Sequence, residues 1–276
     1  MNGTQEKRMF EFARNVNQHG GTKKRRKLRK NKRIGETRKS NSCGMMEIIE
    51  YKKAMDIKVK FKTGSIIKTQ YGQFKKGEVY DPLFPSVFGI GYMGIGKYKA
   101  TANGSITIEY KKWHGMMQRC YDPYCINRQP RYINITVCKE WLNFQVFSEW
   151  FNNNYYEVKN ERVELDKDII KRGNKIYCPE YCSLVPQSIN AMLTKNNKFR
   201  GEYPIGVYKK TNRYIAVTNR NKKKRYIGNF STPTEAFCAY KKEKEKEIKF
   251  RANKYKGVLN EKVYKSLIKY KVKISD

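Results

Sequence analysis

Long apolar runs are absent from this sequence. No stretch approaches the roughly 20 apolar residues that a helix needs to cross a bilayer, and the N-terminus has no apolar signal-peptide core. These absences argue against an integral membrane protein built from helices and against secretion through such a leader. We therefore expect an intracellular protein without a membrane partner.

Acidic residues are also scarce. The 276 residues include 25 Asp and Glu against 60 Lys and Arg, which gives a formal net charge of +35. This excess favours a polyanionic partner, because each neutralised phosphate releases counterions. A membrane surface is the competing partner for this charge, but nucleic acid is the better prediction since no segment could anchor the chain. The length allows one to three domains.

Cysteine pairs of the C-x2-C kind are missing, although Cys178 and Cys182 are separated by three residues and Cys120 and Cys125 by four. The seven cysteines are an odd number, and without a secretion signal they are expected to be reduced thiols. Their spacings are looser than the C-x2-C pairs of zinc ribbons. A zinc site on Cys120, Cys138 and Cys182 is therefore less favoured than a role for these side chains as small apolar groups in a core.

A basic arm is predicted at residues 1–40. Eleven of the seventeen residues from Lys23 to Lys39 are basic and only Glu36 is acidic. Such a run cannot bury its charge, so it is either a solvated tail or lies along a phosphate backbone. Because the rest of the chain is basic too, we favour contact with DNA. The predicted contacts are Arg25, Arg26 and Arg29.

Residues 41–98 alternate apolar and charged side chains with a period of two. The strings MEIIEY, IKVKFK and SIIKTQY predict three or four short antiparallel strands in a small barrel or curled sheet. No catalytic pattern lies in this module. It is a DNA-binding or docking module, or a spacer that simply folds.

A β-hairpin followed by a helix is predicted near the middle of the chain. Asp166 follows an apolar strand residue, a Gly-Asn pair supplies a turn, and Pro186 stands where a helix begins, with Asn190 one turn inside it. This spacing predicts that Asp166 and Asn190 meet. A carboxylate and an amide oxygen suit a hard cation such as Mg²⁺, which keeps several of its waters.

The flanks of this hairpin resemble the HNH endonucleases of phages and mobile elements. Between residues 110 and 193 the chain carries, in order, W..M..RC, V-C-x-x-W-x-x-F-x-x-F, LDKDI and GNKIYCPEYC, which match anchors of that family. The resemblance implies a ββα-metal unit at residues 105–198, hydrolysis of DNA phosphodiester bonds with a single divalent metal bound by Asp166 and Asn190, and, for a phage protein, the host cytoplasm. The implied catalytic residues are Asp166, Lys167, Asp168, Asn174 and Asn190.

Two positions depart from the family pattern. Lys167 stands where typical members use a His as general base, and Tyr181 replaces the middle Asn. A lysine is ordinarily protonated at neutral pH and cannot take a proton from water. Lys167 would then act as a fixed charge, with Asp168 or a metal-bound hydroxide moving the proton, and His114 is a substitute base to consider. The alternative is a catalytically inactive DNA-binding protein or regulator.

The last recognisable unit spans residues 201–252 and predicts three strands and a helix, with Thr232 as N-cap. The strings GVY, RYIAVT, YIGNF and T-x-x-E-A-x-x-A-Y resemble the ethylene-response-factor (apetala-type) DNA-binding domain. The resemblance implies a sheet in the major groove of double-stranded DNA, where arginines read guanine best. The implied DNA-binding residues are Lys209, Lys210, Arg213, Tyr214, Arg220, Lys224, Arg225 and Tyr226. An ordinary basic sheet is the alternative.

Together these patterns predict a multidomain α+β protein. It would contain a small antiparallel β module, a central ββα unit with helices, a C-terminal three-stranded sheet plus helix, and a helical tail at residues 253–276. The function that uses all of these parts is that of a homing-type, sequence-directed DNA endonuclease. In it, one set of residues chooses the duplex and another cuts it.

Overall fold

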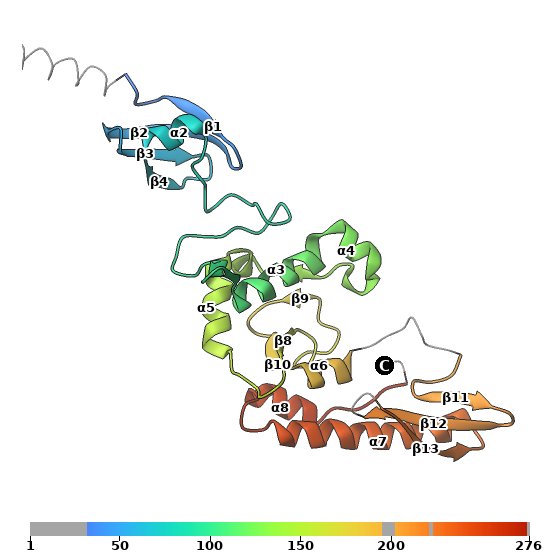
Figure 1. Cartoon of the computed structure of the whole chain (residues 1–276). Coiled ribbons are helices and arrows are strands. Elements are labelled where there is room, and N and C mark those ends of the chain that lie inside the picture. The colour runs from blue at the N-terminus through green and yellow to red at the C-terminus, as the bar shows by residue number, and fades with distance from the viewer. Residues whose placement is uncertain (1–31, 195–201, 221–222, 275–276) are drawn as a thin grey trace, which may run out of the picture. The chain divides into compact units, whose positions relative to one another are not determined.

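The computed structural model describes residues 32–194, 202–220 and 223–274 (Figure 1). The fold is α+β, with several mostly antiparallel sheets, as the sequence predicts. The chain divides into two compact units: the described residues up to Lys97 with Asn143–Gln145, and the rest. Within the described ranges, no helix combines the length and apolar character needed to cross a membrane.

The first unit contains a four-stranded antiparallel sheet in the order β1-β2-β3-β4, with a short helix, α2. In β3, Ile57, Val59 and Phe61 are buried and the residues between them are charged, so the alternation in the sequence is confirmed. Phe74 of α2 is fully buried in the same core. The elements are β1 (Thr37–Ser40), β2 (Gly44–Lys53), β3 (Asp56–Phe61), β4 (Ile66–Thr69) and α2 (Tyr71–Lys76). β1 thus lies within the segment assigned from sequence to the basic arm.

The second unit begins with helices around an aromatic core. Trp113, Trp141 and Phe147 are fully buried, the indole nitrogen of Trp113 donates to the carbonyl of Trp141 (2.7 Å), and Phe147 lies edge-on to Trp141. These residues therefore serve as core rather than as a stacking surface for bases. The elements are β5 (Thr101–Ala102), β6 (Ser105–Ile106), α3 (Ile108–Tyr121), α4 (Pro123–Arg128), η1 (Pro130–Tyr132), β7 (Thr136–Val137), η2 (Lys139–Leu142) and α5 (Phe144–Asn154).

The hairpin and the C-terminal sheet complete the second unit. The N-cap predicted for the long helix is confirmed, because the Thr232 hydroxyl accepts the Glu235 N–H (3.2 Å). The Glu235 carboxylate accepts the N–H of Ser231, one residue before the N-cap (3.1 Å). The elements are β8 (Val163–Asp166), β9 (Ile176–Tyr177), β10 (Ser183–Pro186), α6 (Gln187–Leu193), β11 (Val207–Lys210), β12 (Arg213–Arg220), β13 (Lys223–Phe230), α7 (Pro233–Lys254) and α8 (Glu261–Ile268).

Candidate metal centre and nucleic-acid interface

The predicted hairpin and helix form a ββα arrangement. β8 pairs antiparallel with β10, and α6 follows β10 directly, with Pro186 as its N-cap residue. α6 packs against both strands. The loop between the strands contains β9, which pairs in parallel with β7. Asp166 ends one strand of this arrangement, and Asn190 lies on the helix.

Asp166 is held by the backbone that follows it. Its Oδ1 accepts the N–H groups of Asp168 and Ile169, both at 2.8 Å, in the geometry of an Asx turn. Burial raises the pKa of the Asp166 carboxyl above its ordinary value, and the charge of Asp168 adds to the rise, while the two N–H groups and the charge of Lys167 oppose it. The carboxylate is thus oriented but poorly solvated.

Neighbouring carboxylates have cationic partners that Asp166 lacks. Glu164 pairs with Lys112 of α3 (2.6 Å), and Asp168 pairs with Lys167 (2.7 Å). In the described part of the chain, Asp166 forms no ion pair, and its Oδ2 accepts no hydrogen bond. A partly buried carboxylate in this state is stabilised by a nearby cation. That this cation is a divalent metal ion stays a prediction.

Asn190 lies on α6, the helix that packs against both strands of the hairpin. It follows Ile189, which is fully buried in one cluster with Val185 of β10. Strand alternation and pairing put Asp166 on the same sheet face as Val185, because Val185 pairs with Glu164. Both predicted metal ligands thus belong to elements that pack together. That they share one cation stays a prediction. No group of three His, Cys, Asp or Glu suited to a metal occurs among the described residues.

Lys167 and Asn174 close the loop of the hairpin. Lys167 is 7% exposed, and its Nζ donates to Asp168 Oδ2 (2.7 Å) and to the carbonyl oxygen of Asn174 (2.8 Å). Asn174 is buried, and its Nδ2 donates to the carbonyls of Lys167 (3.0 Å) and Ile176 (2.6 Å). The structure brings the predicted catalytic residues Lys167, Asp168 and Asn174 together, but in contacts that hold the loop. An ammonium that donates these bonds has no lone pair with which to accept a proton.

Arg119 is a candidate that carried no role in the sequence analysis. Its Nε donates to the Tyr177 hydroxyl (3.3 Å), and its guanidinium lies over the rings of Tyr132 (5.8 Å) and Tyr177 (5.6 Å). No carboxylate of the described chain pairs with it. The letters R of W..M..RC and Y of GNKIY were visible in the sequence, but nothing in the sequence showed that they meet. This arrangement offers a positive charge beside the hairpin loop.

The buried Cys120 and Cys182 fit a core role, and Cys138 is half-buried. Burial raises the pKa of Cys120 to about 12 and that of Cys138 to about 11, and it raises the pKa of Cys182 well above the ordinary value. Zinc binds the thiolate, so these shifts oppose it. All seven cysteines are free thiols. The zinc site remains a prediction without structural support.

The C-terminal sheet has the order β11-β12-β13, and α7 packs on one of its faces (Figure 1). Tyr214 and Ala216 belong to the cluster that contains the buried residues of α7, so they mark the helix side. Residues that pair across two strands have their side chains on the same face of the sheet, and successive residues of one strand alternate between the two faces. These two rules assign the remaining side chains to a face. The outer face carries Lys210, Arg213, Lys224 and Tyr226. The helix side carries Lys209, Tyr214 and Arg225.

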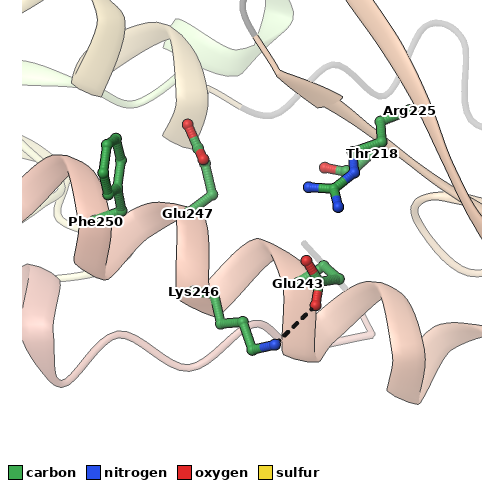
Figure 2. A pocket seen from close by; sticks show the side chains of 6 residues that line it. All are labelled: Thr218, Arg225, Glu243, Lys246, Glu247 and Phe250. Atoms are coloured by element: carbon green, nitrogen blue, oxygen red, sulfur yellow. Dashed lines mark hydrogen bonds and ion pairs between the residues drawn. The ribbon is translucent and has the colours of Figure 1, made fainter.

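Arg225 illustrates this division. It lines a pocket between the sheet and α7 together with Thr218, Glu243, Lys246, Glu247 and Phe250, and Figure 2 shows it pointing toward the helix. The charge of Arg225 helps to lower the pKa of Glu243, although the hydrogen bond from Lys246 is the larger cause. Arg225 is therefore placed away from the outer face, where Tyr226 is 58% exposed. Only the backbone of Arg220 is described, and Arg25, Arg26 and Arg29 lie outside the described residues.

The outer face of the sheet has the composition of a nucleic-acid surface. β11 to β13 contain seven basic residues and no acidic one, and three of the seven, Lys210, Arg213 and Lys224, lie on the outer face. The Lys224 ammonium lies over the Tyr208 ring (4.5 Å), which keeps both groups at the surface.

Comparisons with known proteins found no match: no family model matches the chain, and no curated protein or solved structure does either.

Proposed function

We propose that this protein is a homing-type HNH endonuclease that hydrolyses phosphodiester bonds of double-stranded DNA at a site chosen by its C-terminal sheet. The observation that carries the proposal is Asp166, a partly buried carboxylate without an ion-pair partner in the described chain, at the end of a strand in a ββα arrangement. The basic outer face of β11 to β13 supplies the partner for DNA phosphates and bases.

The chain's own residues have distinct tasks in this proposal. Asp166 and Asn190 would hold one divalent cation such as Mg²⁺, which when bound supplies charge against the phosphate oxygens. Lys167 positions the loop rather than transferring a proton, because both of its described bonds are within the hairpin. The Asp168 side chain is 47% exposed and is the candidate to accept the proton of the attacking water. Arg119 is the candidate to contact the DNA backbone.

Supercoiled plasmid provides the test. We expect the full chain with Mg²⁺ at low salt to nick or linearise the plasmid, and Asp166→Ala to bind it without cutting. Gel shifts on the same DNA check that binding is intact. If the unaltered protein shifts the plasmid but leaves it uncut with Mg²⁺ or Mn²⁺, the nuclease proposal is wrong.

The second candidate is a DNA-binding protein without nuclease activity. The observation that favours it is Lys167, whose ammonium occupies the position of the usual general base and is engaged by Asp168 and Asn174. Tyr181 points the same way, since its ring is covered by the Lys171 ammonium (4.6 Å) rather than offering an amide. Binding without cutting in the plasmid test would select this candidate.

A further inference from the structure

The long helix α7 packs against two different parts of the second unit. Its first half buries Ala236, Phe237 and Tyr240 beside the C-terminal sheet. A Cβ atom built on Gly206, which has φ +77°, would lie 2.2 Å from Cδ2 of Tyr240, so the sheet approaches α7 as closely as glycine allows. This end of α7 is fixed to the inner face of the C-terminal sheet by direct packing.

The second half of α7 packs against the hairpin and its helix. Ile248 and Ala252 are fully buried in one hydrophobic cluster with Val185 of β10 and Ile189 of α6. α7 also contacts α6 and α8 directly. One helix therefore shares its core with both the C-terminal sheet and the ββα arrangement.

A carboxylate joins the end of α7 to the start of α6. The Tyr255 hydroxyl donates to Glu161 Oε2 (2.6 Å), and the other oxygen of Glu161 accepts the N–H of Ser188 in the first turn of α6. Tyr255 is the C-cap residue of α7, and Glu161 lies two residues before β8. These hydrogen bonds thus fix the end of α7 relative to the start of α6, whereas apolar packing alone would let the two helices shift along each other.

The segment after α8 adds a second tie. Arg172 of the hairpin loop donates to the carbonyl of Lys271 (2.9 Å) and lies over the Tyr270 ring (4.7 Å). One residue on, Val272 is buried, its carbonyl accepts from Lys241 Nζ and its N–H donates to Glu245 Oε1, both at 2.9 Å. The segment therefore connects the middle of α7 to the hairpin loop.

We infer that α7 is a rigid spacer that fixes the distance along DNA between the bases read by the sheet and the bond presented to Asp166. The inference rests on the proposed function and adds a geometric rule to it. α7 has 22 residues, which at 1.5 Å per residue is about 33 Å. At about 3.4 Å per base pair, the hairpin lies no more than about 10 base pairs from the recognised bases.

The test uses a readout that does not need nuclease activity. An iron chelate is attached to a cysteine introduced by Lys175→Cys, an exposed position in the hairpin loop, in a chain carrying Cys125→Ser, Cys138→Ser and Cys238→Ser. Duplexes that the full chain binds are selected from a random pool, and hydroxyl radicals from the chelate mark where the loop lies. We expect one compact cluster of cuts at a constant distance from the footprint of the sheet.

Insertions in α7 provide the matched variants. A helix-forming heptad inserted after Lys244 lengthens α7 by about two turns, or about 10 Å, and almost preserves its faces. The radical cuts should move by about 3 base pairs and stay compact, whereas a Gly-Ser heptad at the same place should scatter them. Cuts that are scattered in the parent chain, or that stay in place with the helical insertion, overturn the spacer while the proposed function stands. If no duplex is selected, both the proposed function and the spacer fail.

Discussion

Replacing Lys167 tests whether this residue holds the hairpin loop or takes part in chemistry. The change is Lys167→Met, which keeps the length of the buried stem and removes the ammonium. The lost bond to the Asn174 carbonyl leaves a buried acceptor without its donor, at a cost of about 1–3 kcal/mol. The ion pair with Asp168 adds about 0.5 kcal/mol only, because that carboxylate is half exposed and screened by solvent.

The expected net effect of Lys167→Met is a decrease of about 2 kcal/mol in the free energy of unfolding. The decrease is not larger because methionine has no charge to bury, and the cost of desolvating the ammonium disappears with it. Urea denaturation followed by tryptophan fluorescence suits the measurement. All three tryptophans, Trp113, Trp141 and Trp150, lie in the second unit, so the signal reports the unit that contains the hairpin.

Lys175→Met is the matched control, because Lys175 is an exposed lysine of the same loop. It should change the free energy of unfolding by no more than about 0.5 kcal/mol. The structural role of Lys167 is refuted if both variants are equally stable while only Lys167→Met abolishes DNA cleavage. That outcome would assign the ammonium to the phosphate instead.

Three further predictions concern other parts of the chain. Arg213→Ala, on the outer face of the sheet, should weaken binding to a selected duplex about 10-fold or more, because a lost base contact is worth about 1–3 kcal/mol. Arg225→Ala, on the helix side, should weaken binding less. Gel shifts at one fixed salt concentration compare the two variants, and the reverse order would contradict the assignment of faces. Asp166→Asn should raise the melting temperature at pH 7 without metal and lose that advantage near pH 4. A carboxyl whose pKa is raised on folding stabilises the folded state while it is protonated, and this contribution is lost as the pH rises through the pKa of the folded state. Equal melting temperatures of the two proteins at pH 7 would show that the charged Asp166 carboxylate does not destabilise the fold. A thiol reagent should label exposed Cys238 first and Cys120 only after unfolding, because burial raises the pKa of Cys120 to about 12; prompt labelling of Cys120 in the folded chain would show that its site is open.

Local patterns made much of the fold predictable from the sequence. The strand at Ile57 to Phe61 alternates apolar and charged residues, and a half-buried strand follows directly from that period. The start of α7 was equally readable, because the Thr232 side chain accepts the N–H of Glu235 and the Glu235 side chain accepts the N–H of Ser231, all within five consecutive residues. In both cases the determining contacts are close in sequence.

The face on which Arg225 lies was not predictable in this way. The register between β12 and β13 shifts after Ala216, so that Ala216 pairs with Gly228 but Val217 pairs with Tyr226. One extra residue, Ile227, is thereby accommodated, and every side chain before it on β13 changes face relative to an unbroken register. Without the bulge, Arg225 would oppose Asn219 and point outward. Since Ile227 packs against the core shared with α7, tertiary packing decides the register.

The contacts of the hairpin loop could not be predicted from the sequence for a similar reason. The spacing of Asp166 and Asn190 predicted a hairpin and a helix, because a turn and a helix start are local signals. The partners of Lys167 depend on how the loop of residues 167–182 folds back, and that path is fixed by the pairing of β9 with β7. A motif comparison treats position 167 as a site for a base, whereas the structure shows a buried cation used for loop closure.

The state of Asp166 bears on the choice between a nuclease and an inactive DNA-binding protein. In a chain with a net charge of +35, a lysine partner for one more carboxylate is easily supplied, as Lys112 supplies one for Glu164. A partly buried carboxylate that lacks such a partner in the described chain, and whose pKa is raised by desolvation, lowers the stability of the folded protein at neutral pH. An inactive binding protein gains nothing from this lower stability, whereas a metal-dependent enzyme regains the stability when the cation binds to the folded state. The difference is measurable as a melting temperature that rises with Mg²⁺ in the unaltered protein and stays constant in Asp166→Asn.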